Sequence, residues 1–462
     1  MTDTSIAFLG ATDTVTGSRF LITHGETRIL VDAGLFQGHS AIRQRNWEPF
    51  PVDPQSITAA ILTHAHLDHC GYLPLLVKKG FAGQIHCTEY TKKLAEIILL
   101  DSARIMTEDA KYASRKGYSK HKVPLPLYTE VDVDDAMQSM MPTPYRTRKE
   151  IAPDCFVTFH PAGHILGSAF VLLEVGGKKL LFTGDMGRGH HPLLADPDPM
   201  PKVELDALIT ESTYGDRVHD APTSDFVDII NRTIARGGSV LIPAFAVDRT
   251  EVILMKLREC MESSDIPKVP IYVDSPMALT SLDFYREAVH DDSDDISEEV
   301  SQRWHHQDPF DTGTLHEMRT VEQSKSLNNI TRPSIIVSAS GMATGGRVVH
   351  HLEHMLPNPK NTVMLVGYQA SGTRGQLLAS GIEKLKTHGV WVDVRAEIAK
   401  IESFSVHADG DELMRWFGQA PAPKHVFVVH GEQSSQMVFA NRLARELGWP
   451  AQMAQSGQEY PL

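Results

Sequence analysis

One short segment of the sequence concentrates side chains that could hold metal ions. Residues 63–71 read THAHLDHCG and place three imidazoles and a carboxylate within six positions: His64, His66, Asp68 and His69. Burying four such groups is costly unless they bind something. The segment leaves an apolar strand on a turn, so its side chains can point into one cavity from different sides. Imidazole and carboxylate suit borderline cations, and we expect two closely spaced metal ions, Zn²⁺ first, with Mn²⁺ and Fe²⁺ as alternatives.

Other ligand-type residues stand where further strands are expected to end. They are Asp32, His160, His164, Asp185, Glu211, His407 and His430. Taken singly, each would more often be a structural or capping residue than a ligand. Functional residues collect where strands stop and loops begin. Taken together, they predict one site assembled from strand ends that are widely separated in the sequence.

Composition places the chain among globular proteins. Its 462 residues are 42% hydrophobic and 22% charged, which favours two or three domains with large cores. No apolar run is long enough for a spanning helix, the N-terminus lacks the features of a signal peptide, and no membrane partner is expected. The four cysteines form no CxxC pair, which fits a reducing cytoplasm.

Charge limits the class of partner. The formal net charge of −14 argues against indiscriminate binding to phosphate backbones. It leaves room for a local basic channel.

The pattern of expected elements changes along the chain. The first 210 or so residues predict mainly strands, with hairpins turning at 24–26 and 176–177 and a helix over about 89–115. After about residue 212, buried strands alternate with helices, which predicts a parallel sheet. The expected later strands cover 239–246, 268–275, 333–340, 361–368, 390–398 and 424–431.

The ordered motifs resemble a known family. The His-x-His-x-Asp-His motif, with Asp32, His164 and Asp185 at matching strand ends, resembles the metallo-β-lactamase fold. ESTYGDR (211–217), SFSVHAD (403–409) and VVHGE (428–432) resemble three diagnostic motifs of its β-CASP branch of nucleic-acid-processing hydrolases. The resemblance implies an α/β fold, an αββα sandwich with a two-metal site at one edge and an inserted parallel-sheet domain. The expected lactamase-type parts are 1–212 and 395–462, with the β-CASP domain at 213–394.

The resemblance also assigns roles. One metal takes His64, His66, His164 and Asp185, and the other takes Asp68, His69, His430 and the same Asp185 as a bridge. Asp32 orients the histidine cluster. Asp68, Glu211 and His407 are the expected catalytic side chains, with Glu211 orienting His407 near the scissile phosphate. His160 matches no ligand and is interpreted as structural.

The resemblance narrows the substrate to RNA. Glu211 and His430 stand where the RNA-acting members carry Glu and His. The segments 115–132, 160–169, 338–352 and 367–376 resemble bacterial and archaeal RNA-processing exonucleases and the endonuclease subunit of the pre-mRNA 3′-end cleavage machinery. The implied activity is hydrolysis of single-stranded RNA by a metal-activated hydroxide, as a 5′ exonuclease, an endonuclease or both. Family members often dimerise, and the sequence leaves the oligomeric state open.

A loop in the second part of the chain is a candidate phosphate site. Ser338, Ser340 and Gly341 follow an expected strand and lead through Gly345 and Gly346 into a helix. Small residues there let backbone N–H groups approach a phosphate. The list of candidate phosphate-binding arginines is Arg249, Arg347 and Arg374.

Two other functions stay in competition. A small-molecule metallo-hydrolase of the lactonase or thioesterase type would need the same metal ligands but neither the inserted domain nor the Glu211–His407 pair. A non-catalytic subunit of an RNA-processing complex would have lost ligands, whereas the set here is complete. The native metal, the physiological RNA and the balance of exonuclease and endonuclease activity are open at this stage.

Overall fold

The computed structural model describes residues 4–116, 124–219, 225–367, 369, 372–401, 404–418 and 420–462. Parts of three segments that carry the family resemblance, at 117–123, 368, 370–371 and 403, lie outside the described residues. The chain divides into two units: Met1–Val218 with His407–Leu462, and His219–Val406. The domain boundaries expected from the sequence, after residues 212 and 394, stay a prediction.

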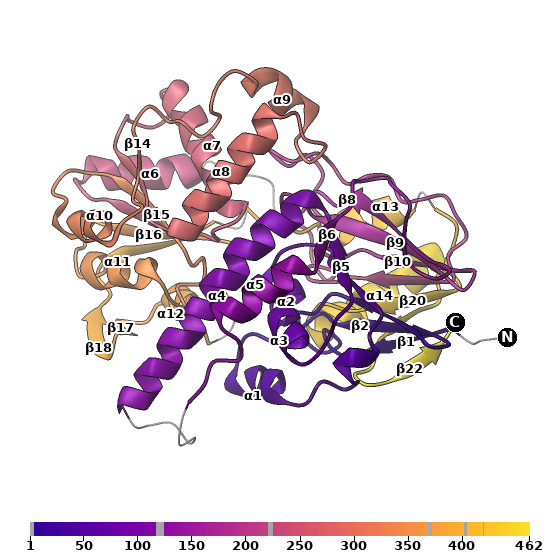
Figure 1. Ribbon diagram of the computed structural model, residues 1–462. Helices are drawn as coiled ribbons and strands as arrows, with labels where there is room; N and C mark the ends of the chain where they lie inside the picture. The colour runs from indigo at the N-terminus through magenta and orange to yellow at the C-terminus, as the bar shows by residue number, and fades with distance from the viewer. Residues whose placement is uncertain are drawn as a thin grey trace. The chain divides into compact units, whose positions relative to one another are not determined.

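Two seven-stranded sheets form the first unit (Figure 1). In spatial order, the first sheet contains β22 (Glu459–Pro461), β1 (Thr4–Phe8), β2 (Phe20–His24), β3 (Thr27–Val31), β4 (Ala59–Ile61), β5 (Gln84–Cys87) and β6 (Met140–Pro142). The second contains β21 (Ala451–Met453), β20 (His425–Val428), β11 (Ala207–Thr210), β10 (Lys178–Phe182), β9 (Ala169–Val175), β8 (Cys155–Pro161) and β7 (Lys149–Ala152). Both hairpins expected from the sequence, β2–β3 and β9–β10, are confirmed.

The two sheets bury a shared core. Ile6, Phe8, Phe159 and Phe182, from strands of both sheets, are almost completely buried in one cluster. The alternation of buried and half-buried residues along β8 gives each strand one face toward this core, as its period of two requires. Phe8 and Phe427 are in contact with tilted rings, 4.9 Å between centroids, so the C-terminal strands are held by the same core as the N-terminal ones.

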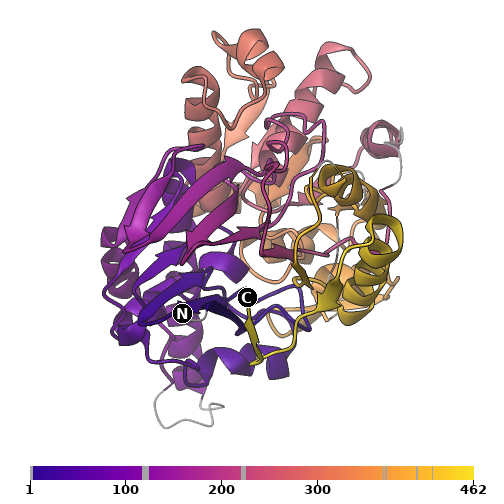
Figure 2. The same ribbon diagram turned by 90° about the vertical axis from the view of Figure 1, so that its right-hand side faces the viewer.

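Helices cover the outer faces. The helices of the first unit are α1 (Ser40–Gln44), α2 (Leu67–Cys70), α3 (Leu73–Lys78), α4 (Glu89–Lys116), α5 (Glu130–Gln138), α13 (Gly410–Phe417) and α14 (Gln433–Leu447). The long helix expected over 89–115 is α4, which packs with α5 and against β6. The yellow helices α13 and α14 lie next to each other (Figure 2), where Phe417 and Phe439 pack on Phe170 and Leu181 of the second sheet. This layering is the αββα sandwich expected from the sequence.

The second unit is built on a parallel sheet. Its strands are β14 (Leu315–Glu317), β13 (Ile271–Val273), β15 (Ile335–Ser338), β12 (Val240–Pro243), β16 (Thr362–Val366) and β19 (Glu397–Ile401). All of its neighbouring strands pair in parallel, as the alternating pattern predicts. The helices are α6 (Asp225–Ala235), α7 (Arg249–Glu262), α8 (Pro276–His290), α9 (Glu298–Trp304), α10 (Val321–Ser326), α11 (Arg347–Met355) and α12 (Arg374–Ala379).

The single strand expected over 390–398 is wrong. Among the described residues, Val390–Asp393 form β18, which pairs with β17 (Lys384–Thr387) in a separate two-stranded hairpin, whereas Glu397 begins β19 of the parallel sheet. Between them, the amides of Arg395 and Ala396 both donate to the carbonyl of Leu356. These tertiary hydrogen bonds interrupt the strand, and local hydrophobicity does not reveal them.

Within the described residues, no helix is both long enough and apolar enough to cross a bilayer.

Candidate metal centre

Parallel pairing gathers the ligand-type residues at one edge of the sandwich. Asp32 follows β3 and His64 follows β4, and these two strands run parallel. Asp185, Glu211 and His430 follow β10, β11 and β20, which also run parallel in this order. Parallel strands end on the same side of a sheet, so residues up to about 400 positions apart meet at this edge. The strand-end pattern in the sequence therefore corresponds to one place in the first unit.

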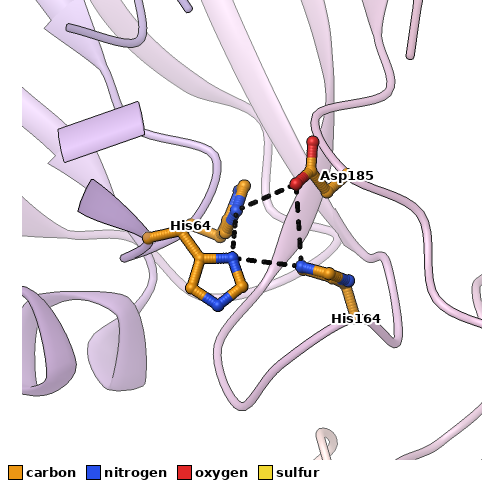
Figure 3. Close-up of side chains that lie close together, drawn as sticks. His64, His164 and Asp185 are labelled. Carbon is orange, nitrogen blue, oxygen red and sulfur yellow. Dashed lines mark hydrogen bonds and ion pairs between the residues drawn. The ribbon is translucent and has the colours of Figure 1, made fainter. Parts of the chain in front are cut away.

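Three imidazoles and one carboxylate form a first group of donors. His66 Nδ1 lies 3.2 Å from His64 Nε2 and 3.2 Å from His164 Nε2. Asp185 Oδ2 lies 3.5 Å from His64 Nε2 and 3.7 Å from His164 Nε2. Figure 3 shows the side chains of His64, His164 and Asp185 pointing toward one another.

A second group of donors lies beside the first. His69 Nε2 is 3.2 Å from His430 Nε2, and Asp68 Oδ2 is 3.4 Å from the same nitrogen of His430. The other carboxylate oxygen of Asp185, Oδ1, lies 3.3 Å from His69 Nε2 and 3.4 Å from His430 Nδ1. Asp185 thus presents one oxygen to each group.

These distances fit divalent metal ions. Nitrogens bound at about 2.0–2.1 Å to one tetrahedral Zn²⁺ lie about 3.3–3.4 Å apart. The convergent imidazole nitrogens of both groups are spaced at 3.2 Å. Although Asp185 Oδ1 is buried, no hydrogen bond to it forms among the described residues. The donors therefore suit cations better than they suit one another.

Electrostatics support the same reading. Burial would raise the pKa of Asp185, but His430, His69 and His64 outweigh it and hold that pKa well below its ordinary value. Burial and the neighbouring imidazole of His69 lower the pKa of His64 well below its usual range. Asp185 is therefore a carboxylate and His64 a neutral imidazole near pH 7, which are the forms that bind metals.

The hydroxyl groups of Thr63 and Thr213 help to orient the donors and were not identified from the sequence. Asp32 Oδ2 lies 2.8 Å from His69 Nδ1, and Asp32 also accepts hydrogen bonds from the amide and hydroxyl of Thr63. His69 therefore points Nε2 into the donor group, the outer role expected for Asp32. Thr213 Oγ1 lies 3.1 Å from His430 Nδ1 and fixes that ring in the same way. Thr63 and Thr213 lie inside the segments THAHLDHCG and ESTYGDR, and that position is the signal that could have found them.

His407 and Glu211 form a pair at the rim of the donor groups. His407 Nδ1 lies 3.3 Å from Glu211 Oε2 and 3.9 Å from Asp185 Oδ2. The amide of Met186 donates to Glu211 Oε1 at 2.5 Å, which anchors the carboxylate. Burial would lower the pKa of His407, but Glu211 outweighs it and raises that pKa. The imidazole ring of His407 is 4.4 Å from that of His164.

The predicted phosphate-binding residues belong to the second unit. Ser338 is buried and donates to the carbonyl of Asp274 at 2.8 Å, while Ser340 caps its own loop by accepting from the amide of Thr344. Gly341 follows in the same loop. Arg249 is also buried and donates to the carbonyl of Val366. Their role in binding phosphate stays a prediction.

His160 and the other two arginines have structural contacts. His160 Nδ1 lies 3.3 Å from Asp198 Oδ2, and its ring stacks on Phe170, as its structural interpretation expects. Arg347 forms a 2.7 Å ion pair with Asp274. Arg374 donates to the carbonyl of Thr344 at 2.8 Å.

Comparison with known proteins identifies the family. The Metallo-beta-lactamase superfamily matches residues 13–230, the Beta-Casp domain matches 250–378, and the Zn-dependent metallo-hydrolase RNA specificity domain matches 391–454. Ribonuclease TTHA0252 of Thermus thermophilus is 35% identical over 98% of this chain and 99% of its own length. The chain belongs to the metallo-β-lactamase superfamily, in its β-CASP branch.

Two further β-CASP relatives span most of the chain. An RNase J-like protein of Methanocaldococcus jannaschii is 32% identical over 94% of both chains. Transcription termination factor FttA of the same organism is 30% identical over 95% of this chain and 69% of its own length. Membership of the metallo-β-lactamase superfamily implies divalent metal binding, and the two donor groups are where this chain could provide it.

We expect Gly34→Ala to deplete the metal centre. A Cβ at Gly34 would lie 1.6 Å from the carbonyl oxygen of Asp68, so the Asp68–His69 segment would have to move. Metal analysis of the purified variant should show less bound metal than in the unaltered protein. Gly189→Ala is the matched control, since no described atom lies within 4 Å of its Cβ. Full metal content in a folded Gly34→Ala protein would contradict the assigned position of Asp68.

Proposed function

We propose that this chain is a two-zinc ribonuclease that hydrolyses phosphodiester bonds of single-stranded RNA. The observation that carries the proposal is the Asp185 carboxylate, whose two oxygens face separate groups of donors. The match to an RNA specificity domain and the relatives named as ribonucleases favour RNA as the substrate. The first ion would be held by His64, His66, His164 and Asp185, and the second by Asp68, His69, His430 and Asp185.

The metal centre matches the demands of a phosphodiester. The phosphate is anionic and repels hydroxide, so its hydrolysis needs positive charge on both the attacking and the leaving side. Two bound cations supply Lewis acidity, lowering the pKa of water and neutralising charge on the phosphoryl oxygens. The role of Asp185 is to fix the separation of the two donor groups. Asp32 and Thr213 keep the rings of His69 and His430 aimed at the centre.

His407 is suited to give a proton to the leaving oxygen. Its Nδ1 lies 3.3 Å from Glu211 Oε2, so we assign proton donation to Nε2. Glu211 raises the pKa of His407, which favours the protonated ring, and the fixed carboxylate of Glu211 holds its orientation. As the phosphorus–oxygen bond breaks, the proton on Nε2 would pass to the departing oxygen, completing hydrolysis.

The direction of cutting depends on the second unit. The loop of Ser338, Ser340 and Gly341 precedes α11, and with Arg249 it forms our candidate site for a terminal 5′-phosphate. Binding there would favour cutting from the 5′ end, beside endonuclease activity.

The four cysteines are free and buried, which supports a reducing cytoplasm as the location. We propose a homodimer, because members of the family often dimerise.

End-labelled RNA tests the proposed activity. We expect the zinc-loaded protein to release labelled mononucleotide early from 5′-labelled, 5′-phosphorylated RNA, and only late from 3′-labelled RNA, while single-stranded DNA is cut slowly. RNA with a 5′-hydroxyl should be degraded more slowly than its phosphorylated twin. Asp185→Asn should abolish cutting and lose metal.

Each alternative makes a different pattern. Turnover of a lactone or thioester with intact RNA would establish a small-molecule hydrolase instead. A metal-free protein that binds RNA without cutting it would indicate a non-catalytic subunit. Internal fragments from both labelled substrates, without early mononucleotide, would indicate endonuclease activity instead of cutting from the 5′ end.

We expect His407→Ala to slow RNA hydrolysis by about 100-fold or more while leaving metal content unchanged, because general acids typically contribute that much. Bis(4-nitrophenyl) phosphate, whose leaving group needs no proton, should be hydrolysed at nearly the rate of the unaltered protein. His39→Ala, at an exposed histidine before α1, is the control. Loss of metal from His407→Ala, or equal slowing on both substrates, would overturn the proton-donor role.

A further inference from the structure

A second cluster of histidines and a carboxylate lies on the surface of the second unit. It consists of His350 and Glu353 on α11 and His388 in the turn between β17 and β18. One ligand atom from each residue lies within 4.8 Å of the others. No role in the proposed reaction is assigned to these residues.

Of two neighbouring histidines on α11, one is buried and the other is exposed. His351 is buried, with its Nε2 2.6 Å from Asp274 Oδ2, so it serves the interior of the unit. His350 is exposed on the other side, and Glu353 follows three residues later, where side chains of a helix become neighbours. His354 is also on α11, and its Nδ1 lies 2.8 Å from the carbonyl of His350.

The hairpin delivers the third side chain. Thr387 pairs with Val390, and the two residues between them, His388 and Gly389, both have positive φ, of 44° and 87°. This is the backbone of a tight two-residue turn, which Asn-Gly or Gly-Gly would fit with less strain than a histidine. Because α11 packs against β17, the turn places His388 beside the helix.

The cluster of His350, Glu353 and His388 makes more contacts than a single ion pair would. His388 Nδ1 lies 3.1 Å from Glu353 Oε2, which by itself would be an ordinary surface pair. The ring of His350 is stacked on that of His388 at 4.2 Å between centroids and 24° between planes. Burial and the adjacent His388 lower the pKa of His350. The uncharged imidazole of His350 is therefore favoured, and a charged ion pair with Glu353 is not. A neutral imidazole is, however, the form that binds a metal.

We propose that His350, Glu353 and His388 form a binding site for a divalent transition-metal cation, separate in sequence and structural unit from the metal centre. Two imidazoles and one carboxylate with open remaining positions are a donor set that Zn²⁺ takes. The side chains of His350 and His388 are exposed, and rotation about their side-chain bonds brings both ring planes toward one ion. A bound ion would clip the β17–β18 hairpin to α11.

The test counts metal on the whole protein. After equilibrium dialysis against Zn²⁺ with the metal centre filled, we expect one more equivalent per chain than the metal centre holds. The double variant His350→Ala/His388→Ala should lose that equivalent, with at least about a tenfold weaker affinity, since even outer partners of a metal site contribute 10–100-fold. His316→Ala removes a different exposed histidine of the same unit and should retain it.

Backbone amide exchange gives an independent readout. Added Zn²⁺ should slow exchange over Lys384–Asp393 in the unaltered protein and in His316→Ala, and leave it unchanged in the double variant. Equal zinc stoichiometry in the unaltered protein and the double variant would overturn the proposal. So would a loss of the same equivalent in His316→Ala, because that result would mean unspecific binding to surface histidines.

Discussion

The placement of one buried carboxylate governs the first unit. Asp185 is only 2% exposed, and an isolated charge at such a position is strongly unfavourable. Nitrogens of four imidazoles lie within 3.7 Å of its oxygens, and each oxygen faces a different pair of these nitrogens. Hydrogen bonds between imidazole nitrogens 3.2 Å apart would still leave Asp185 Oδ1 buried without a hydrogen bond among the described residues. Cations resolve both problems, so the charge of Asp185 and the clustering of the histidines explain each other.

The αββα sandwich holds the proposed ligands in position. The proposed ligands follow four strands, β4, β8, β10 and β20, whose ends are held by the core of the sandwich. Asp32 and His430 both adopt positive φ, of 59° and 49°, a conformation that costs energy in residues with side chains. Their amides are nonetheless bonded, that of His430 to the carbonyl of Ala11 at 2.7 Å and that of Asp32 to Ile61 at 2.8 Å. The surrounding strands thus impose the strained backbone that aims both side chains inward.

Much of this site could be predicted from the sequence, for a specific reason. A His or Asp that ends an apolar run is visible in one dimension, and parallel pairing then brings such ends together, as with His64 and Asp185. Thr63 and Thr213 were not visible, because a hydroxyl beside a ligand looks like any other threonine. The division of 390–398 between two sheets was missed as well, since it depends on two amides reaching Leu356, a residue more than thirty positions earlier. The cluster at His350 and His388 joins a helix to a turn, and neither segment carries a complete motif.

The central claim is that Asp185 is shared by two metal ions, and magnetic coupling tests it most directly. The protein and the Asp185→Asn variant should be treated with the same concentration of Mn²⁺, and their electron paramagnetic resonance spectra compared. A carboxylate bridge predicts two ions per chain with an exchange-coupled spectrum, which collapses in the variant. A spectrum of isolated Mn²⁺ ions in the unaltered protein would contradict the shared role of Asp185.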